Sequence, residues 1–172
     1  MGQEFSSAAD LNDTLLKAIG LIANYLEAEG GALFLLDEEE YYLDCVASIG
    51  PTKITNLRLK ADQGIVGKSV KTNSGRIVRN VKTDPDFHKG IDEQTGFTTK
   101  SILCAPMSVK DARLGAIELI NKKGNDGLFN DEDLKFLQVL ASSAALAILN
   151  ARMAGQLVEQ ERIRRELQLA AE

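Results

Sequence analysis

The sequence predicts an α+β fold, with a mainly antiparallel sheet of about six strands at its centre. Three observations lead to this prediction. Short apolar runs of alternating character recur in neighbouring pairs around polar turns, as they do in hairpins. Helical patterns stand at both ends of the chain, and we expect these terminal helices to cover one face of the sheet. We expect the long polar stretch and the short helices between the strands to cover the other face.

The elements of the first half follow in order from the N-terminus. Apolar residues at helical spacing predict an amphipathic helix over residues 10–28, ending near Gly30 and Gly31. Two strands around an acidic turn then form a hairpin, and a third strand follows the break at Gly50 and Pro51. These three strands are expected at residues 32–36, 41–48 and 57–60.

The second half alternates short elements with one long loop. A short helix over 64–71 and an extended piece over 76–80 precede the polar stretch 81–99, which we interpret as a lid with one helical turn. Two further strands are expected at 100–109 and 113–120. The last helix begins near Asn130, and its pattern continues to Glu172, several times the usual helix length.

Composition narrows the class of protein. The 172 residues fit one domain plus an extension. A net charge of −5 argues against binding to nucleic acid or to an anionic membrane. No apolar run approaches a membrane span and no signal peptide is evident, so we expect a cytoplasmic protein without membrane contact. Cys45 and Cys104 each lie inside an apolar strand pattern, which favours buried free thiols.

Two patterns that could carry chemistry are incomplete. Residues 64–69 end like a phosphate-binding P-loop, but Asp62 stands where that loop needs glycine. Acidic residues surround His88, the single histidine, yet Lys89 and Thr95 occupy positions where a calcium loop needs glycine and an acid. We therefore expect a turn and a solvated loop here, with no metal ion, no nucleotide hydrolysis and no catalytic residues.

Several motifs together resemble the GAF domain family of small-molecule sensors, over most of residues 10–155. The matching stretches run from Ala61 to Gly67, from Thr72 to Val78 with Asp84, Pro85 and Phe87 following, from Ser101 to Met107, and from Gly115 to Lys122. The resemblance implies the fold described above. It also implies a role in sensing a small molecule or a partner.

The strand-to-helix signature of that family is nearly complete here. Asn121, Lys122, Phe129 and Asp133 match it, whereas Leu134 replaces its final acid. The resemblance implies a structural salt bridge between Lys122 and Asp133. Because the final acid is missing, the signature supports the fold but gives little indication of cyclic-nucleotide binding.

The sequence around the two cysteines does not match the cysteine sites of other family members. Members that bind bilin attach it through a cysteine usually followed by histidine, but Val46 follows Cys45 and Ala105 follows Cys104. Methionine-sulfoxide reductases of the family use clustered cysteines, which this pattern does not offer. We expect no bilin, and the sequence leaves the identity of any ligand open.

Glu118 is the charge that interrupts an apolar strand, on the same face as Ala116 and Ile120. It either lies at an edge or outward position, or forms the wall of a cavity, where an unpaired carboxylate would be costly. In cyclic-nucleotide-binding relatives, an acid at about this position can contact the base. The residues hypothesised to complete a ligand pocket with Glu118 are Phe34 and Asp37 near the end of the first strand, and Thr95, Thr98 and Thr99 in the lid.

The last helix carries a heptad pattern. The repeating positions are Leu146, Asn150, Met153, Leu157, Gln160, Arg164, Leu167 and Ala171. Up to about Ala151 we expect the helix to dock on its own sheet, and beyond Gly155 to pair with a partner helix. This divides the chain into a domain at 1–155 and a coiled-coil signalling helix at 156–172, with a homodimer formed through the terminal helices.

The tail from Glu161 to Glu172 resembles the linker that precedes PP2C-type serine phosphatases of the SpoIIE and RsbU kind in bacterial stress signalling. The resemblance implies a downstream effector domain, a phosphatase that regulates a stress sigma factor pathway. The sequence thus predicts a regulatory sensor without catalytic activity of its own. The alternative is a ligand-free dimerisation or interaction module.

Overall fold

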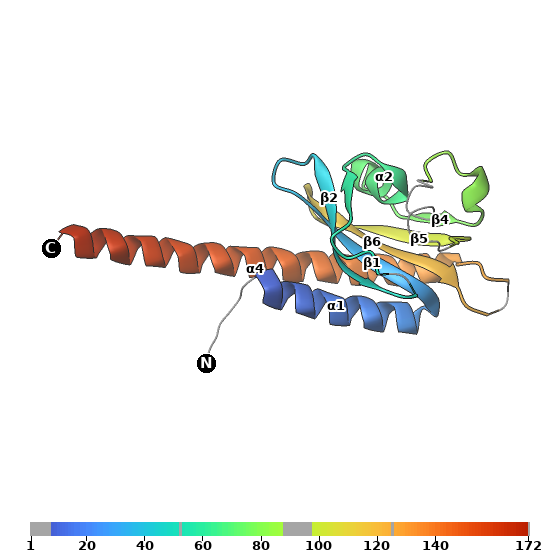
Figure 1. Ribbon diagram of the computed structural model, residues 1–172, viewed down its shortest axis with the longest axis horizontal. Coiled ribbons are helices and arrows are strands. Elements are labelled where there is room, and N and C mark those ends of the chain that lie inside the picture. Colours follow the sequence, from blue (N-terminus) through green and yellow to red (C-terminus); the bar gives the residue numbers. More distant parts are fainter. Residues whose placement is uncertain (1–7, 52, 88–97, 125, 172) are drawn as a thin grey trace.

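The computed structural model describes residues 8–51, 53–87, 98–124 and 126–171. They form one curved sheet of six strands in the order β3-β2-β1-β6-β5-β4, in which all neighbouring strands are antiparallel (Figure 1). The strands are β1 (Ala28–Leu36), β2 (Tyr42–Ile49), β3 (Arg58–Lys60), β4 (Arg76–Val78), β5 (Ile102–Val109) and β6 (Ala112–Lys122). The helices are α1 (Ala8–Tyr25), α2 (Gly64–Thr72), the short 3-10 helix η1 (Val81–Thr83) and α4 (Asp131–Ala171).

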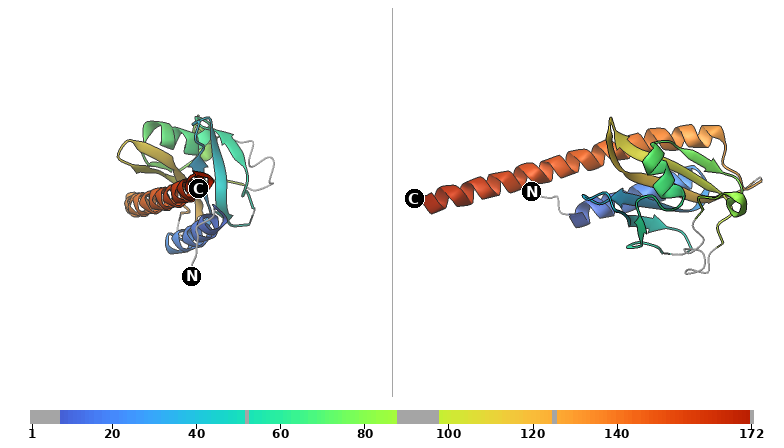
Figure 2. Two further views of the ribbon diagram at one scale, coloured as in Figure 1. Left: turned by 90° about the vertical axis from the view of Figure 1, so that its left-hand side faces the viewer. Right: turned by 90° about the horizontal axis from the view of Figure 1, so that it is seen from above.

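The sheet is the middle of three layers, which confirms the predicted α+β architecture. Helices α1 and α4 lie side by side on one face, and α2 covers the other (Figures 1 and 2). Alternate residues of β6 supply both cores, because successive side chains of a strand point to opposite faces. Ile117 and Leu119 belong to the core beneath α1 and α4, and Ala116 belongs to the core beneath α2.

The boundary between the first helix and the first strand differs from the sequence prediction. α1 runs from Ala8 to Tyr25 and not over 10–28, and Gly30 and Gly31 lie inside β1. The glycines are there for packing: a Cβ atom on Gly31 would stand 2.8 Å from Leu119 Cδ2 and 3.3 Å from the side chain of Ile19. Paired glycines locally predict a helix end, but here Gly31 allows α1 to approach the sheet, and a Cβ atom on Gly30 would stand 3.1 Å from the carbonyl oxygen of Ile49.

Helix α4 has a docked part and a free part. Leu137, Ala141, Ala145 and Ile148 are buried against the sheet, and Ile148 is the last buried residue among those described. At about 1.5 Å per residue, α4 continues for roughly 35 Å beyond Ile148. Figure 1 shows this part of the helix leaving the domain.

Among the described helices, α4 is also the one long and apolar enough to cross a membrane, with a mean hydropathy of 1.5 over 18 residues. Core helices of soluble proteins meet the same criterion. One side of α4 packs on the sheet of its own domain, and 22% of this apolar window is buried.

Candidate functional site

Lys122 and Asp133 form the ion pair that the family signature implies. Lys122 Nζ lies 3.3 Å from Asp133 Oδ1, and the two side chains are only 17% and 11% exposed. Lys122 Nζ also donates a hydrogen bond to the carbonyl of Leu26 at 2.9 Å. Asp133 in turn caps the start of α4, since its Oδ2 accepts from the amide of Asn130 at 3.0 Å. One lysine therefore ties the end of α1 to the beginning of α4.

The neighbouring signature residues complete this junction. Phe129 is buried in the core beneath α1 and α4, with its ring centroid 5.9 Å from Lys122 Nζ. Leu134, which replaces the acid of the signature, is half-buried and packs on the same core. An acid at this position would meet apolar neighbours.

Asn121 anchors the end of the 81–99 segment. It is buried with φ 57°, and its Oδ1 accepts from the amides of Lys100 at 2.7 Å and Ser101 at 3.2 Å. Its Nδ2 donates to the carbonyl of Thr98 at 3.0 Å and to Glu29 Oε1 at 3.1 Å. The amide thus links β6 to the entrance of β5 and to β1, a role that the sequence pattern did not indicate.

Arg76 holds the other end of the same segment. Its guanidinium lies 3.2 Å from Asp84 Oδ2 and 2.8 Å from Asp86 Oδ2, and all three side chains are partly buried. The sequence analysis did not single out Arg76, although the acidic pair around Pro85 was a signal for a basic partner. The described ends of the 81–99 segment are therefore both fastened to the sheet, while residues 88–97, including His88 and Thr95, lie outside the described residues.

Glu118 lies at the centre of the sheet and faces α2. Its neighbours across the strands are Ala32 on β1 and Cys104 on β5, and all three lie on the α2 side. This excludes an edge position, because β6 has a strand on either side. The half-buried carboxylate is thus framed by small side chains, including Ala116 on its own strand.

The surroundings of Glu118 also affect both thiols. Burial raises the pKa of Cys45 to about 12, and the negative charge of Glu118 adds to this rise. Burial and the same carboxylate raise the pKa of Cys104 as well. The two cysteines lie on strands separated by β1 and β6, and both are free thiols. Neither has the low pKa of a reactive cysteine.

The hypothesised ligand residues are not all brought together. Phe34 is buried on the same face as Glu118, where it pairs with Ala116. Asp37 stands five residues beyond Ala32, which is roughly 16 Å along a strand. Its Oδ1 accepts from the amide of Tyr41 at 2.8 Å and therefore shapes the hairpin turn.

The two described threonines of the set lie at the entrance of β5. Thr99 is buried, whereas Thr98 is exposed and is held through its carbonyl by Asn121. Phe34 and Glu118 thus share one surface, while Asp37 lies near one end of the sheet and the threonines lie near the other. The described members of the set therefore stand at different levels along the sheet, and the ligand pocket stays a hypothesis, with Thr95 outside the described residues. Hydrophobic alternation predicts which face a residue occupies, but not its level along the sheet.

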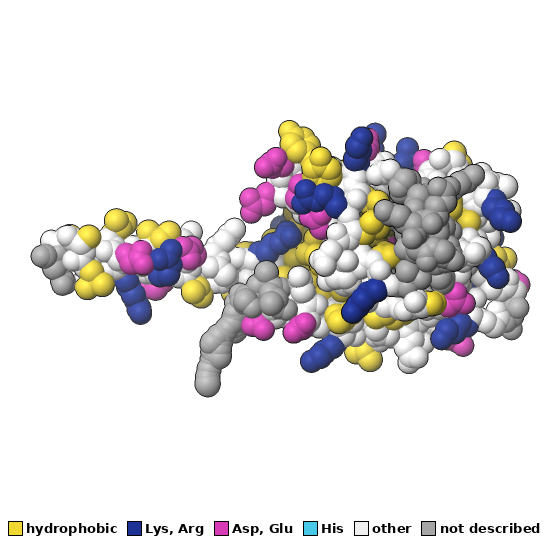
Figure 3. Space-filling model, viewed as in Figure 1, with side chains coloured by type: hydrophobic (Ala, Val, Ile, Leu, Met, Phe, Trp, Pro, Cys, Tyr) yellow, Lys and Arg dark blue, Asp and Glu magenta, His cyan; other side chains and the backbone are white. Residues whose placement is uncertain are grey.

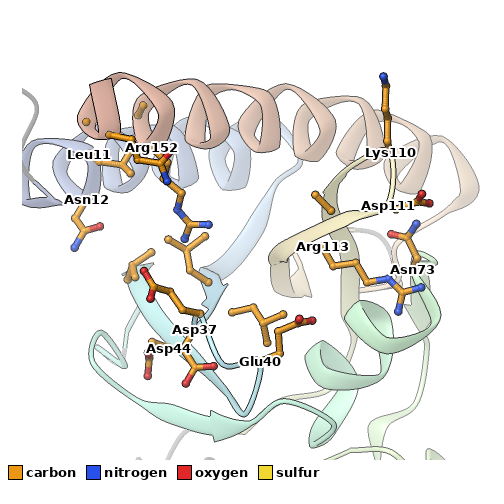
Figure 4. A pocket seen from close by; sticks show the side chains of 18 of the residues that line it. Leu11, Asn12, Asp37, Glu40, Asp44, Asn73, Lys110, Asp111, Arg113 and Arg152 are labelled. Carbon is orange, nitrogen blue, oxygen red and sulfur yellow. The ribbon is translucent and has the colours of Figure 1, made fainter. Parts of the chain in front are cut away.

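A hollow lies where α4 leaves the sheet (Figure 4). It has a volume of about 1300 Å³ and is open to solvent. Its walls come from the β1–β2 and β5–β6 turns, the start of α1 and the middle of α4, and Arg152 points into it from α4. Its lining carries charges of both signs, with more acids than bases: the acids are Asp37, Glu38, Glu40, Asp44, Asp111 and Glu159, and the bases are Lys110, Arg113 and Arg152. In the described part of the chain, no group of three or more metal-ligating side chains forms a candidate metal centre.

Comparison with known proteins agrees with this geometry. A model of the GAF domain family matches residues 8–149. The chain is 24% identical over 160 residues to the probable 3′,5′-cyclic phosphodiesterase pde-5 of Caenorhabditis elegans, a match that covers 87% of this chain and 22% of that protein. The chain therefore spans about a fifth of the length of this curated relative.

Solved structures share the fold. The GAF domain of a phosphoenolpyruvate-protein phosphotransferase from Coxiella burnetii superposes with a TM-score of 0.75 at 22% identity, covering 85% of this chain and 86% of the other. Free methionine-R-sulfoxide reductase from Neisseria meningitidis, solved with its substrate, gives 0.69 at 17% identity, covering 86% and 83%. With the signature junction of Lys122 and Asp133 in place, and with a family match over most of its length, the chain belongs to the GAF domain family.

Proposed function

We infer that this chain is the regulatory, small-molecule-sensing GAF domain of a cytoplasmic bacterial signalling protein. The observation that carries this proposal is the position of Glu118, a half-buried carboxylate at the centre of the sheet among small side chains. A carboxylate accepts hydrogen bonds and attracts cations, so the ligand that suits it presents an N–H, O–H or cationic group. The curated phosphodiesterase relative agrees with a signalling context.

The output of the domain is α4. Both described ends of the 81–99 segment are tied to the sheet, and Asn121 stands next to Lys122, which holds the start of α4. A ligand on the α2 face that binds one arrangement of these anchors more tightly than another would shift the equilibrium between the two arrangements. The position of α4 would change with the anchors. In the homodimer that we propose, the paired helices carry this change to an effector.

The effector that we propose is a PP2C-type serine phosphatase acting in a stress sigma factor pathway. This part rests on the tail from Glu161 to Glu172 and its resemblance to the linkers of such proteins. The domain itself acts without catalysis in this proposal. The pKa values of its two buried thiols are raised. This supports a regulatory role rather than the activity of the methionine-R-sulfoxide reductase that shares its fold.

A ligand-free dimerisation module is the second candidate, and one observation favours it. The core between the sheet and α2 is already filled by large side chains, among them Phe34, Leu43 and Ile65. Such a domain would position its effector without sensing a metabolite.

Thermal unfolding with a panel of cyclic nucleotides and cationic or amide-bearing metabolites separates the two candidates. A ligand at about 100 times its Kd stabilises the protein by about 2.7 kcal/mol, which raises Tm by roughly 5–10 °C for a chain of this size. We expect this rise for the wild type and for Glu39→Gln, an exposed matched control, and its loss in Glu118→Gln. A flat response of the wild type to the whole panel favours the ligand-free module.

A further inference from the structure

Strands β4 and β6 end, and β5 begins, at the side of the domain where α4 starts (Figure 1). Their pairing holds Val78, Ile102 and Ile120 in one row. Arg79 and Asn121 stand in the next row, with the residue before β5 between them. Because neighbouring strands are about 4.8 Å apart, the backbones of these two residues lie roughly 10 Å from each other. The sheet thus brings Arg79 from its edge to the junction of β6 and α4.

Two adjacent hollows open to solvent at this junction. The larger has a volume of about 730 Å³ and the smaller a volume of about 280 Å³. Both are lined by Arg79, Lys122, Asp126 and Leu128, which shows that they adjoin each other. The larger volume falls in the usual range of small-molecule sites, roughly 300–1,000 Å³. We name the two together the basic hollow.

Bases outnumber acids in the lining of the basic hollow. The bases are Arg79, Lys100, Lys122 and Lys123, and the acids are Glu29 and Asp126. This excess is local, because the whole chain carries a net charge of −5. Figure 3 shows basic and acidic side chains interspersed over the face of the molecule in view.

The bases of the basic hollow have hydrogen-bond donors to spare. The ammonium group of Lys122 offers three N–H donors. It uses two of them, for the carboxylate of Asp133 and the carbonyl of Leu26. Within the described residues, the side chains of the other three bases form no ion pair or hydrogen bond. One donor of Lys122 and all the donors of its three neighbours are therefore available to a ligand.

The two acids of the lining are engaged with neutral partners. Asp126 Oδ1 accepts from the backbone amide of Leu128 at 3.0 Å. Glu29 Oε1 accepts from Asn121 Nδ2 at 3.1 Å. Neither carboxylate forms an ion pair with a described base, so the cations other than Lys122 lack a counter-ion from the protein. An anion from solution would supply one.

The rest of the lining suits a phosphate group. Apart from Leu128, the larger hollow is lined by polar residues and glycines. Gly124, with φ 75° and no side chain, leaves its backbone open to close approach by a ligand. A guanidinium donates two parallel hydrogen bonds to phosphate oxygens, and ammonium groups add point charges. Several cations attract a dianionic phosphate more strongly than a carboxylate of single charge.

We propose that the basic hollow binds a dianionic phosphate group, carried by inorganic phosphate or by a small phosphorylated metabolite. Arg79 clamps the phosphate oxygens, and Lys100, Lys123 and the third donor of Lys122 neutralise its charge. The inference goes beyond the proposed function, whose ligand contacts Glu118, a residue that does not line this hollow. The bound anion lies beside the lysine that holds the start of α4.

Titration of the full chain with inorganic phosphate tests the site. Amide proton–nitrogen NMR spectra are followed at pH 8 and constant ionic strength, where the phosphate is mainly dianionic. We expect saturable shifts at the amides of Lys100, Ser101, Lys123 and Gly124. Shifts that rise linearly without saturation, or that spread evenly over exposed lysines, overturn the proposal.

Matched variants separate a built site from general charge attraction. Arg79→Gln should weaken phosphate binding by about tenfold or more, because it removes the charged donor pair. Lys17→Gln, on an exposed part of α1, makes the same change in net charge and should alter the affinity by less than about threefold. Equal effects of the two variants overturn the site. Circular dichroism confirms that both variants keep the fold.

Asp126→Asn gives a test of opposite sign. The amide oxygen of asparagine can still accept from the amide of Leu128, whereas the negative charge in the lining is gone. We expect phosphate to bind about threefold more tightly. Weaker binding in this variant contradicts an anion site.

Two further titrations identify the chemistry of the ligand. Glycerol phosphate that binds more tightly than inorganic phosphate assigns the hollow to a phosphorylated metabolite, and weaker binding assigns it to the free ion. Acetate that binds as tightly as phosphate overturns the preference for a dianion. Glu118→Gln should leave the phosphate titration unchanged, so a failure here leaves the proposed function standing, and the reverse also holds.

Discussion

The ammonium group of Lys122, at the end of β6, lies 3.3 Å from the carboxylate of Asp133 in the first turn of α4. Because the same ammonium group binds the carbonyl of Leu26, the pair joins the last strand to both helices on one face of the sheet, α1 and α4. Asn121, the residue before Lys122, fastens the entrance of β5. Four elements of the domain thus meet at two adjacent residues.

Breaking this ion pair should destabilise the domain strongly. Lys122→Met leaves the carboxylate of Asp133 partly buried without its cation, and we expect a loss of about 3 kcal/mol in the free energy of unfolding. Arg162→Met, which removes exposed pairs in the tail, should leave it close to the wild-type value, because solvent screens exposed ion pairs. Urea unfolding of both variants measures the contrast, and equal losses would show that burial of the pair is unimportant.

Asn121 should be far less replaceable than Asn73, although both adopt positive φ. Asn121→Ala removes four hydrogen bonds and strains the backbone, at an expected cost of about 3 kcal/mol. Asn73→Gly, at the exposed C-cap of α2, should be neutral within about 0.5 kcal/mol, since glycine suits that conformation. Thermal unfolding of the two variants provides the comparison. A neutral Asn121→Ala would refute the anchoring role.

Two glycines should respond in opposite directions to alanine. At Gly115, φ is 158° and a Cβ atom would stand 1.9 Å from the carbonyl oxygen of Phe34, so Gly115→Ala should cost at least about 3 kcal/mol or prevent folding. A Cβ atom on Gly155 would meet no other atom within 4 Å outside its own stretch of helix, so Gly155→Ala should stabilise α4 by about 0.5–1 kcal/mol. Soluble yield, Tm and helical ellipticity record both effects. A loss of helix in Gly155→Ala would indicate that flexibility there is part of the fold.

The buried thiols should make the domain sensitive to alkali. Cys45 has a pKa of about 12 in the folded protein against 9.0 for a free thiol, because burial disfavours the thiolate. Between pH 9 and pH 12 the unfolded chain therefore loses this proton first, and stability falls by about 1.4 kcal/mol per pH unit for the thiol. Below pH 9 the contribution is fully present.

Urea unfolding at pH 8, 9 and 10 measures this dependence. Cys45→Ala should lower the slope of stability against pH above 9, whatever its effect at pH 8. All other ionisable groups are the same in both proteins, so the difference between the two slopes isolates the thiol. Identical slopes would mean that Cys45 ionises in the folded state as readily as in the unfolded one.

Local patterns were sufficient for most of the elements. Period-two alternation around Tyr42–Ile49 and helical spacing in Gly64–Thr72 depend on near neighbours, so the strand and the helix could be predicted from the sequence. The ion pair of Lys122 and Asp133 was accessible through a motif whose members lie close together in the chain. Asn121 was missed as an anchor because its partners become neighbours only in the folded chain, whereas Arg76 was missed although Asp84 and Asp86 stand only eight and ten residues away. Glu29, for example, is 92 residues away from Asn121.

The amino-acid sequence determined the order of the elements, the two faces of β6 and the heptad seam of α4, since each follows from the periodicity of side chains along one segment. Tertiary structure decided that Gly30 and Gly31 belong to a strand, because the close neighbours there belong to other segments: Ile49 and Ile120 at Gly30, Ile19 and Leu119 at Gly31. It also decided the levels of Phe34, Asp37 and Glu118 along the sheet. Strand register sets those levels, and register depends on pairing between strands that no single segment contains.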